Sequence, residues 1–535
     1  MKSSHTALLA AVVLCLALAA CGRPAAKPAQ PPVPTPSRSS TPTASVTPTA
    51  TSAPPPASVL TYRGDFARTG WYQNESALTA DVAARFAPLW QSPTVNGRIY
   101  AQPLVDGAHA LVLVATTAND IYAFHSATGA LAWGPVNVGQ PVPRSLLACG
   151  DVDPVGILST PVLDPTTSTL YAVAQVRQGA AGMAYEILAL DSATGAMRPG
   201  YPVALQAPSG FNVRYQQQRA ALTLLNGTLY VPFGGYWGDC GPYHGWLIGV
   251  PLSHPTAQQS FMVPTAREGA IWSAAGVATA PDGTLYATTG NGSSSGPVDF
   301  GNAVLHIQTQ PSLGFNRQDF FAPSNFAALN DQDADIGSAS PVILPPQTGT
   351  TTPNLIFAMG KPGVAYLLNR DSLGGLSHGN GITGEGLFSA CLFGPCGQQR
   401  AGSFATAAYW QGGSAGNFLF AAGGGHQPAP CQAQGGVLGL RLGTQSNGAS
   451  DFSVGWCSVG MTDPGSPAVT GPTGGNAVVW VIDTRGGRLY ALSAATGKTI
   501  WSADIGQTER FIAPAIAGGR VFVGVPDRVL AFAAP

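Results

Sequence analysis

The chain has 535 residues, of which only 10% are charged, and its formal net charge is −1. Without a basic excess it is not expected to bind nucleic acid. After the N-terminus, no segment reaches the roughly 18 apolar residues of a membrane helix. The 67 glycines and 46 prolines instead predict many short strands joined by tight turns.

The N-terminus has the pattern of an export signal followed by a tether. Residues 1–20 combine Lys2 with a continuous apolar stretch, which is typical of a secretory signal peptide. Leu18-Ala-Ala-Cys21 is similar to a bacterial lipobox, so we expect cleavage before Cys21 and lipid attachment to its sulfur; the alternative is an ordinary signal in which Cys21 is incidental. Residues 21–58, rich in Pro, Ala, Ser and Thr, indicate an extended tether. We therefore expect an exported lipoprotein that the lipid holds at the extracytoplasmic face of a membrane.

Six cysteines remain once Cys15 and Cys21 are set aside. An even number in an exported chain indicates up to three disulfides. Cys391 and Cys396 would close a short loop, and elimination then leaves Cys431 with Cys457 and Cys149 with Cys240. A metal site is the alternative, but the spacing lacks paired CxxC units.

One turn sequence recurs along the chain. Ser126-Ala-Thr-Gly129, Asp191-Ser-Ala-Thr-Gly195 and Ser493-Ala-Ala-Thr-Gly497 each follow a run that alternates apolar residues. A Ser or Asp that bonds its own backbone, followed by a Gly that tolerates positive φ, is typical of a hairpin turn. Trp residues near these turns are expected to pack between neighbouring repeats: Trp90, Trp133, Trp456 and Trp501.

Eight strands of the type Leu-Tyr-Val, such as Leu229-Tyr-Val231 and Leu285-Tyr-Ala287, divide the 450 residues from Phe86 to the C-terminus into units of about 56. This spacing predicts one all-β domain over residues 59–535, an eight-bladed β-propeller of four-stranded antiparallel blades. The last unit is one strand short, so we expect residues 86–91 to supply the missing strand and close the ring. A β-sandwich or two smaller propellers are the alternatives.

These repeats resemble those of the pyrroloquinoline-quinone (PQQ) family, the quinoprotein dehydrogenases and their non-catalytic relatives. The resemblance covers residues 60–532 and includes Tyr62-Arg-Gly-Asp65 and Arg68-Thr-Gly70, which are similar to the opening segment of quinoproteins. It implies PQQ at the mouth of the central channel, a Ca²⁺ that polarises the quinone, and a carboxylate that takes the substrate hydroxyl proton.

The resemblance points to a set of candidate site residues. Asn291 in Thr289-Gly-Asn291 corresponds to a metal ligand, although an Asn-Gly hairpin turn explains it equally. Asp239 is the carboxylate nearest to a second metal ligand. The acids at 331–335 stand where the enzymes carry the catalytic base, and a solvated or structural Ca²⁺ loop is the alternative. The candidate bases are these three acids: Asp331, Asp333 and Asp335. The groups that would contact the cofactor are Trp272, as the floor beneath it, and Arg219 and Arg400, as partners of the PQQ carboxylates.

The adjacent-cysteine disulfide found above the quinone in the alcohol dehydrogenases is missing. We therefore predict a lipid-anchored, non-catalytic binding or scaffold module, a monomer with a protein or carbohydrate partner and no assured cofactor. The alternative is a PQQ- and Ca²⁺-dependent dehydrogenase that oxidises an alcohol or sugar. A third hypothesis is polysaccharide binding through exposed aromatics: Tyr236, Trp237 and Tyr243.

Overall fold

The computed structural model describes residues 57–293, 296, 298–398 and 402–535. The predicted signal peptide (1–20), the lipidation site Cys21, nearly all of the tether (21–58) and Arg400 lie outside the described residues. In the described part no helix is long and apolar enough to span a membrane.

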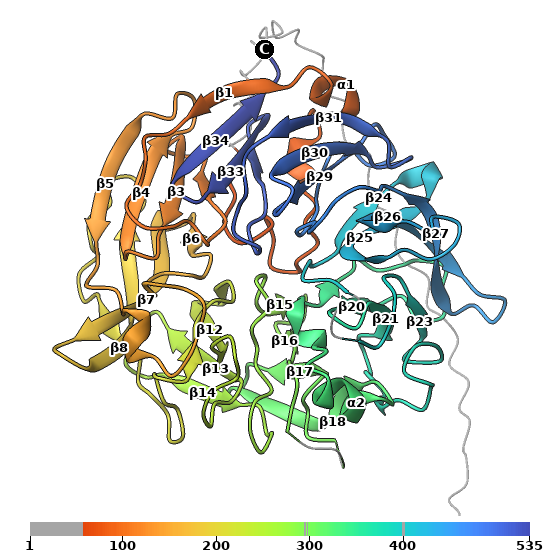
Figure 1. Cartoon of the computed structure of the whole chain (residues 1–535), viewed down its shortest axis with the longest axis horizontal. Coiled ribbons are helices and arrows are strands. Elements are labelled where there is room, and N and C mark those ends of the chain that lie inside the picture. The colour runs from red at the N-terminus through yellow and green to blue at the C-terminus, as the bar shows by residue number, and fades with distance from the viewer. Residues whose placement is uncertain (1–56, 294–295, 297, 399–401) are drawn as a thin grey trace, which may run out of the picture. The chain divides into compact units, whose positions relative to one another are not determined.

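Eight β-sheets stand in a ring around a central axis (Figure 1). Each is a blade whose first strand lies innermost, and successive strands pair antiparallel. The first four blades consist of β2 (Leu104–Asp106), β3 (Leu111–Ala115), β4 (Asp120–His125) and β5 (Leu131–Asn137); β6 (Val162–Asp164), β7 (Thr169–Gln178), β8 (Gly182–Asp191) and β9 (Val203–Ala204); β10 (Gln216–Gln217), β11 (Thr223–Leu225), β12 (Thr228–Gly235), β13 (Trp246–Pro251) and β14 (Gln259–Met262); and β15 (Ala278–Thr279), β16 (Leu285–Thr288), β17 (Val304–Gln308), β18 (Gly314–Ala322) and β22 (Gly375–Leu376).

The second half of the ring repeats the plan. Blades 5 to 8 consist of β19 (Val342–Ile343), β20 (Leu355–Met359), β21 (Val364–Asn369) and β23 (Phe388–Cys391); β24 (Ala408–Gln411), β25 (Asn417–His426), β26 (Gln434–Thr444) and β27 (Ser450–Cys457); β28 (Ala468–Thr470), β29 (Val478–Asp483), β30 (Arg488–Ser493) and β31 (Thr499–Asp504); and β32 (Ala515–Ala517), β33 (Arg520–Val525), β34 (Arg528–Ala533) and β1 (Ala87–Gln91). The two α-helices of the described part are α1 (Ala80–Ala83) and α2 (Phe326–Asp331).

The predicted eight-bladed propeller is confirmed, with one refinement. Blades 3 and 4 each carry a fifth short strand, and β22 pairs with β18 in parallel. The predicted closure is also confirmed, because β1 pairs antiparallel with β34 and places Ala87 opposite Ala533. The first and last strands of the propeller thus share one sheet, which removes the free edge that an open ring would expose.

The recurrent turn is the seat for a tryptophan from the preceding blade. Trp133 in β5 donates its indole Nε1–H to the carbonyl of Ser192 at 3.0 Å, inside the turn of blade 2. A Cβ on Gly195 would lie 2.6 Å from the Trp133 ring, so only glycine fits beneath it. Trp90 and Trp456 make the same contact with the turns of blades 1 and 7. The predicted packing between blades is confirmed.

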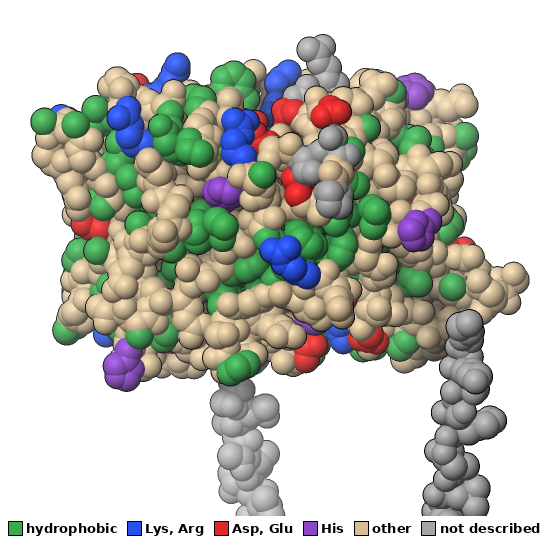
Figure 2. Space-filling view, turned by 90° about the horizontal axis from the view of Figure 1, so that it is seen from below, with side chains coloured by type: hydrophobic (Ala, Val, Ile, Leu, Met, Phe, Trp, Pro, Cys, Tyr) green, Lys and Arg blue, Asp and Glu red, His purple; other side chains and the backbone are tan. Residues whose placement is uncertain are grey.

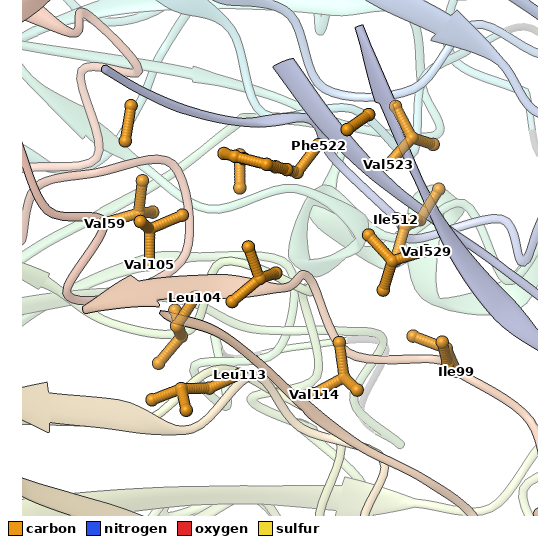
Figure 3. Close-up of a cluster of buried hydrophobic side chains, with 14 of the residues drawn as sticks. Val59, Ile99, Leu104, Val105, Leu113, Val114, Ile512, Phe522, Val523 and Val529 are labelled. Carbon is orange, nitrogen blue, oxygen red and sulfur yellow. The ribbon is translucent and has the colours of Figure 1, made fainter. Parts of the chain in front are cut away.

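The rest of the core is aliphatic. Strands that face neighbouring blades on both sides are buried along their whole length, as β3 and β20 are. Figure 3 shows where blades 8 and 1 meet, with Phe522, Val523 and Val529 of blade 8 and Leu104 and Leu113 of blade 1 in one apolar cluster. Burial of this apolar surface is the main force that holds the blades together.

Residues 59–75 form what we call the inner hoop, which contacts all eight blades. Val59 pairs with Val105 of blade 1, and the carbonyl of Leu60 accepts the Leu163 N–H of blade 2. Further on, hoop carbonyls accept N–H groups of inner strands from blades 4, 5, 6 and 7: Phe66 from Thr279, Ala67 from Ile343, Thr69 from Tyr409, and Gly70 from Val469.

Two arginines complete the hoop. Arg63 and Arg68 are fully buried and donate mainly to backbone carbonyls. Arg63 reaches Ala407 at 2.8 Å, and Arg68 reaches the hydroxyl of Thr223 in blade 3 at 2.7 Å. At the far end, Glu75 accepts the N–H groups of the β32–β33 turn in blade 8.

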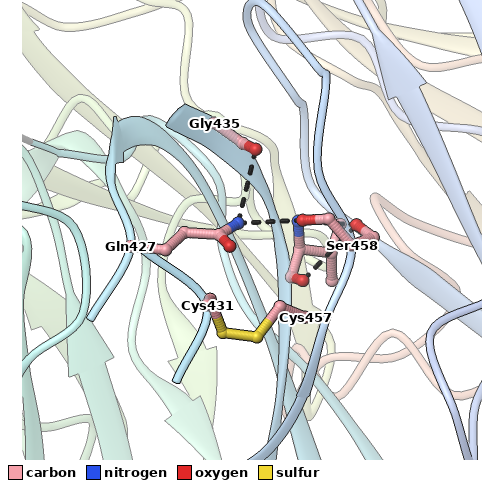
Figure 4. The surroundings of a disulfide bond; sticks show 6 residues. Gln427, Cys431, Gly435, Cys457 and Ser458 are labelled. Atoms are coloured by element: carbon pink, nitrogen blue, oxygen red, sulfur yellow. Dashed lines mark hydrogen bonds between the residues drawn. A yellow bond between two sulfur atoms is a disulfide. The ribbon is translucent and has the colours of Figure 1, made fainter. Parts of the chain in front are cut away.

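Three disulfides join the six cysteines of the propeller: Cys149–Cys240, Cys391–Cys396 and Cys431–Cys457. They are the pairs that loop length and elimination indicated. Figure 4 shows Cys431–Cys457 beside Gln427, whose amide donates to the carbonyls of Gly435 and Ser458. Among the described residues on the side of the ring in Figure 2, Lys and Arg are scattered and form no extended basic patch.

Candidate functional site

A cavity of about 1040 Å³ lies at one end of the central channel. Its walls include segments that precede inner strands, such as Ala270 and Trp272 before β15. A second cavity of about 560 Å³ has Thr279 and Ile343, at the other ends of two inner strands, in its wall. The two therefore lie at opposite ends of the channel, and the hoop lines the second. We call the first the channel-end cavity.

Most of the predicted site residues meet in the channel-end cavity. Asp239, Trp272, Asn291, Asp333 and Asp335 all line it. Asp331 does not, because it is exposed at the end of α2.

Lys361 holds the two inner acids of this group. Its Nζ lies 2.8 Å from Oδ1 of Asp333 and 2.7 Å from Oδ2 of Asp335. The other oxygen of Asp335 accepts the backbone N–H of Asn291 at 2.6 Å. Burial raises the pKa of Asp335. Burial opposes the charge on Lys361, but the two carboxylates raise the pKa of Lys361 and keep it protonated.

The other acids of the site also have donors. Asp239 accepts the hydroxyl of Tyr243 at 2.6 Å, and burial raises the pKa of Asp239. Glu268 pairs with Arg267 and accepts Nδ2 of Asn291 at 3.1 Å. Within the described residues no group of three or more His, Cys, Asp or Glu side chains is arranged to hold a metal ion. The carboxylates are neutralised by protein donors, so we derive no step through Ca²⁺.

Three aromatic rings form a cluster in the cavity, with their planes inclined by 58–88° to one another. Trp272, Phe404 and Phe511 lie with ring centroids 6.2–6.3 Å apart. Cations stand over these rings: Arg219 is 4.3 Å from the centroid of Phe511 and 4.9 Å from that of Trp272. Each such contact contributes about 0.5–2 kcal/mol, more when it is desolvated. Trp272 thus has the aromatic surroundings expected of a ligand platform.

The expectation that Tyr236 and Tyr243 are exposed is wrong. Both are buried, because the hydroxyl of Tyr236 donates to Gln175 and that of Tyr243 to Asp239. Trp237 is 70% exposed and stands at the cavity. Only this one of the three aromatics can offer its face to a ligand.

Sequence reasoning missed Lys361, Glu268 and Arg510, although Lys361 carried a signal. Asn291 and Lys361 each follow a glycine just after the second strand of a blade, β16 in blade 4 and β20 in blade 5. The residue after that glycine faces the channel-end cavity in both blades. Aligning the repeats on this glycine would have placed Lys361 at the position that corresponds to Asn291, and so at the same cavity.

With this geometry established, the comparisons with known proteins are informative. The family described as the outer membrane protein assembly factor BamB, a PQQ-type repeat family, matches residues 447–534, from the last strand of blade 6 to the end of blade 8. The chain has a PQQ-like β-propeller fold. No curated protein sequence matches the chain.

Solved structures of quinoproteins share this fold over most of the chain. The quinohemoprotein alcohol dehydrogenase of Pseudomonas putida is 12% identical with a TM-score of 0.63, and that of Comamonas testosteroni is 16% identical with 0.58; each alignment covers 89% of this chain and 80% of the other. A europium-containing methanol dehydrogenase is 14% identical with a TM-score of 0.57, over 89% of this chain and 91% of its own. At these identities the likeness shows the fold alone.

Proposed function

We propose that the protein is an extracytoplasmic PQQ-like propeller, anchored through lipid on Cys21, that binds a small anionic ligand in its channel-end cavity. The observation that carries this proposal is the convergence of Trp272, Lys361 and Arg219 with the acids on one cavity. A cavity lined by aromatic rings, with a few charged groups fixed around them, is the usual composition of a small-molecule site.

The donor set fits a planar polyanion such as PQQ. Trp272 supplies an aromatic ring to the cavity wall, and Arg219 and Lys361, which stand over that ring, offer charge to carboxylates. A bound PQQ would supply two-electron oxidation of a hydroxyl group.

A second candidate, oxidation of an alcohol or sugar, is favoured by the placement of Asp335. Its carboxylate is buried and fixed by Lys361 and by the Asn291 N–H. Because burial raises the pKa of Asp335, this carboxylate has a greater proton affinity than an exposed aspartate and can accept a proton from a hydroxyl. In this candidate Lys361 and Asn291 position the base.

The two candidates separate in one experiment. The full-length protein in detergent is titrated with PQQ, with and without Ca²⁺, and binding is followed by the quinone absorbance and by quenching of tryptophan fluorescence. Saturable uptake supports the binding proposal, and no uptake of PQQ or of any small carboxylate contradicts it. Dye-linked oxidation of alcohols and sugars then tests the second candidate.

Two variants sharpen this test. Asp335→Asn should retain PQQ binding and lose dye-linked oxidation, whereas Asp331→Asn, outside the cavity, should change neither. For the anchor, Cys21→Ala should release the protein from membranes; retention there would place the anchor elsewhere.

A further inference from the structure

Arg219 is a cation in the channel-end cavity without an anionic partner. It precedes β11, and its Nε is enclosed with no hydrogen-bond partner among the described residues. No ion pair of Arg219 is found in that part of the chain either. The acid that acts on Arg219 electrostatically, Asp151, is exposed and raises the pKa of Arg219 without forming an ion pair with it.

The guanidinium of Arg219 is positioned by aromatic rings and not by a carboxylate. The rings of Phe511 and Trp272 flank the guanidinium. Burial lowers the pKa of Arg219 to about 10, so the side chain stays charged at neutral pH. Arg510, over the ring of Phe404, also lies nearby, but Asp463 pairs with it at 3.1 Å. An enclosed, unpaired guanidinium is costly unless an anion meets it.

Acceptors for hydroxyl groups also line this cavity. Asp239 and Asp335 present carboxylate groups to it, and the exposed face of Trp237 stands at the same cavity. A ligand that satisfies both sets carries a carboxylate, several hydroxyls and a flat apolar face. A hexuronic acid combines these three features in one ring.

We propose that the channel-end cavity binds an acidic sugar of the hexuronate class, with its carboxylate on Arg219 and its hydroxyls toward Asp239 and Asp335. This inference rests on the proposed function, since it names the ligand of the same cavity. Arg219 is then the residue that distinguishes an acidic sugar from the neutral sugar of the same shape.

The test uses the full-length protein in detergent and compares D-glucuronate with D-glucose by calorimetry. A charge-assisted hydrogen bond to an enclosed guanidinium favours glucuronate by about tenfold or more. Arg219→Met should remove this preference, and Arg219→Lys should retain part of it. Arg214→Met is the matched control, because Arg214 lies five residues earlier, is exposed and does not line the cavity; it should bind like the wild type.

Each outcome decides the matter. Equal affinity for the two sugars, or unchanged glucuronate binding in Arg219→Met, overturns the inference. If glucuronate does not bind while PQQ does, the inference fails and the proposed function stands; if neither binds, both fail. Should Arg219→Met unfold, the comparison of Arg219→Lys with the wild type still measures the preference: a reduced preference for glucuronate with normal glucose binding would support the inference, and an undiminished preference would overturn it.

Discussion

The contact between Trp456 and the turn of blade 7 yields a prediction with a matched control. Gly497 has φ +69°, and a Cβ added there would lie 2.2 Å from Cε3 of Trp456. Gly506, beyond β31 in the same blade, has φ +74°, and a Cβ there meets nothing within 4 Å. Substituting alanine at each position therefore adds the same atom under the same backbone strain, and only the neighbour differs.

The magnitudes follow from these contacts. Alanine at positive φ costs about 1–2 kcal/mol of unfolding free energy in both variants. In Gly497→Ala the Trp456 ring, only 8% exposed, must also move and lose its 2.8 Å hydrogen bond to the carbonyl of Ala494. That loss is about 1 kcal/mol for the hydrogen bond plus part of the 3–5 kcal/mol that complete removal of a buried Trp costs. We expect Gly497→Ala to be less stable than Gly506→Ala by about 2–3 kcal/mol.

Urea unfolding of both variants measures this difference. Combining each with Trp456→Ala completes a double-mutant cycle, in which Gly497→Ala should cost no more than Gly506→Ala once the ring is gone. Equal destabilisation of the two single variants would refute the reasoning, because it would mean that the ring relaxes away from the turn at no cost.

Three further predictions concern the charges and the disulfides. Lys361→Met should lower the free energy of unfolding by about 3–5 kcal/mol, because it leaves Asp335 buried without its cation. Since the pKa of Asp335 is raised in the folded protein, the stability that protonated Asp335 contributes at low pH is lost as the pH rises through that pKa. Urea unfolding of the variant should therefore show a larger loss at neutral than at acidic pH, and an equal loss at both would contradict this. Arg63→Met should also cost about 3–5 kcal/mol in thermal or urea unfolding, because its carbonyl partners stay buried and unpaired; a loss below about 1 kcal/mol would mean that the hoop is dispensable. Replacing Cys149 and Cys240 by Ser removes a disulfide that links residues 91 apart, and it should lower the free energy of unfolding by about 4–5 kcal/mol. The same replacement of Cys391 and Cys396, which are 5 residues apart, should lower it by about 2 kcal/mol. The reverse order would show that local strain, not chain entropy, sets the contribution of these disulfides to stability.

The fold could be predicted because its information is local and repeated. The turns around Gly129, Gly195 and Gly497 need a backbone that only glycine adopts easily, and the tryptophan that covers each of them lies in the outer strand of the preceding blade. Closure by β1 was predictable too, since the last repeat lacked a fourth strand and the segment at 87–91 precedes the first repeat without belonging to it.

The site was only partly predictable, since its geometry is made by residues far apart in the chain. Asn291 and Asp335 were found through a motif, but the partner that fixes both inner acids, Lys361, stands in a different repeat. Nothing in the sequence around Arg219 marked it as unusual. What sets it apart is that no carboxylate pairs with it among the described residues, and such partners are determined by the fold. The exposure of Tyr236 and Tyr243 was misjudged for the same reason: their hydroxyl partners come from other segments.

The inner hoop has a consequence for the order of assembly. Residues 59–75 leave the ribosome before any of the blades, yet their hydrogen-bond partners come from all eight blades, and the last of these, Gly518 and Gly519, are made nearly at the end. The hoop can therefore reach its final place only after the whole chain is present. A truncation that removes only β34 would keep the last partners of the hoop but leave β1 without the strand it pairs with, so a chain nearly complete in length would still be an unfinished ring.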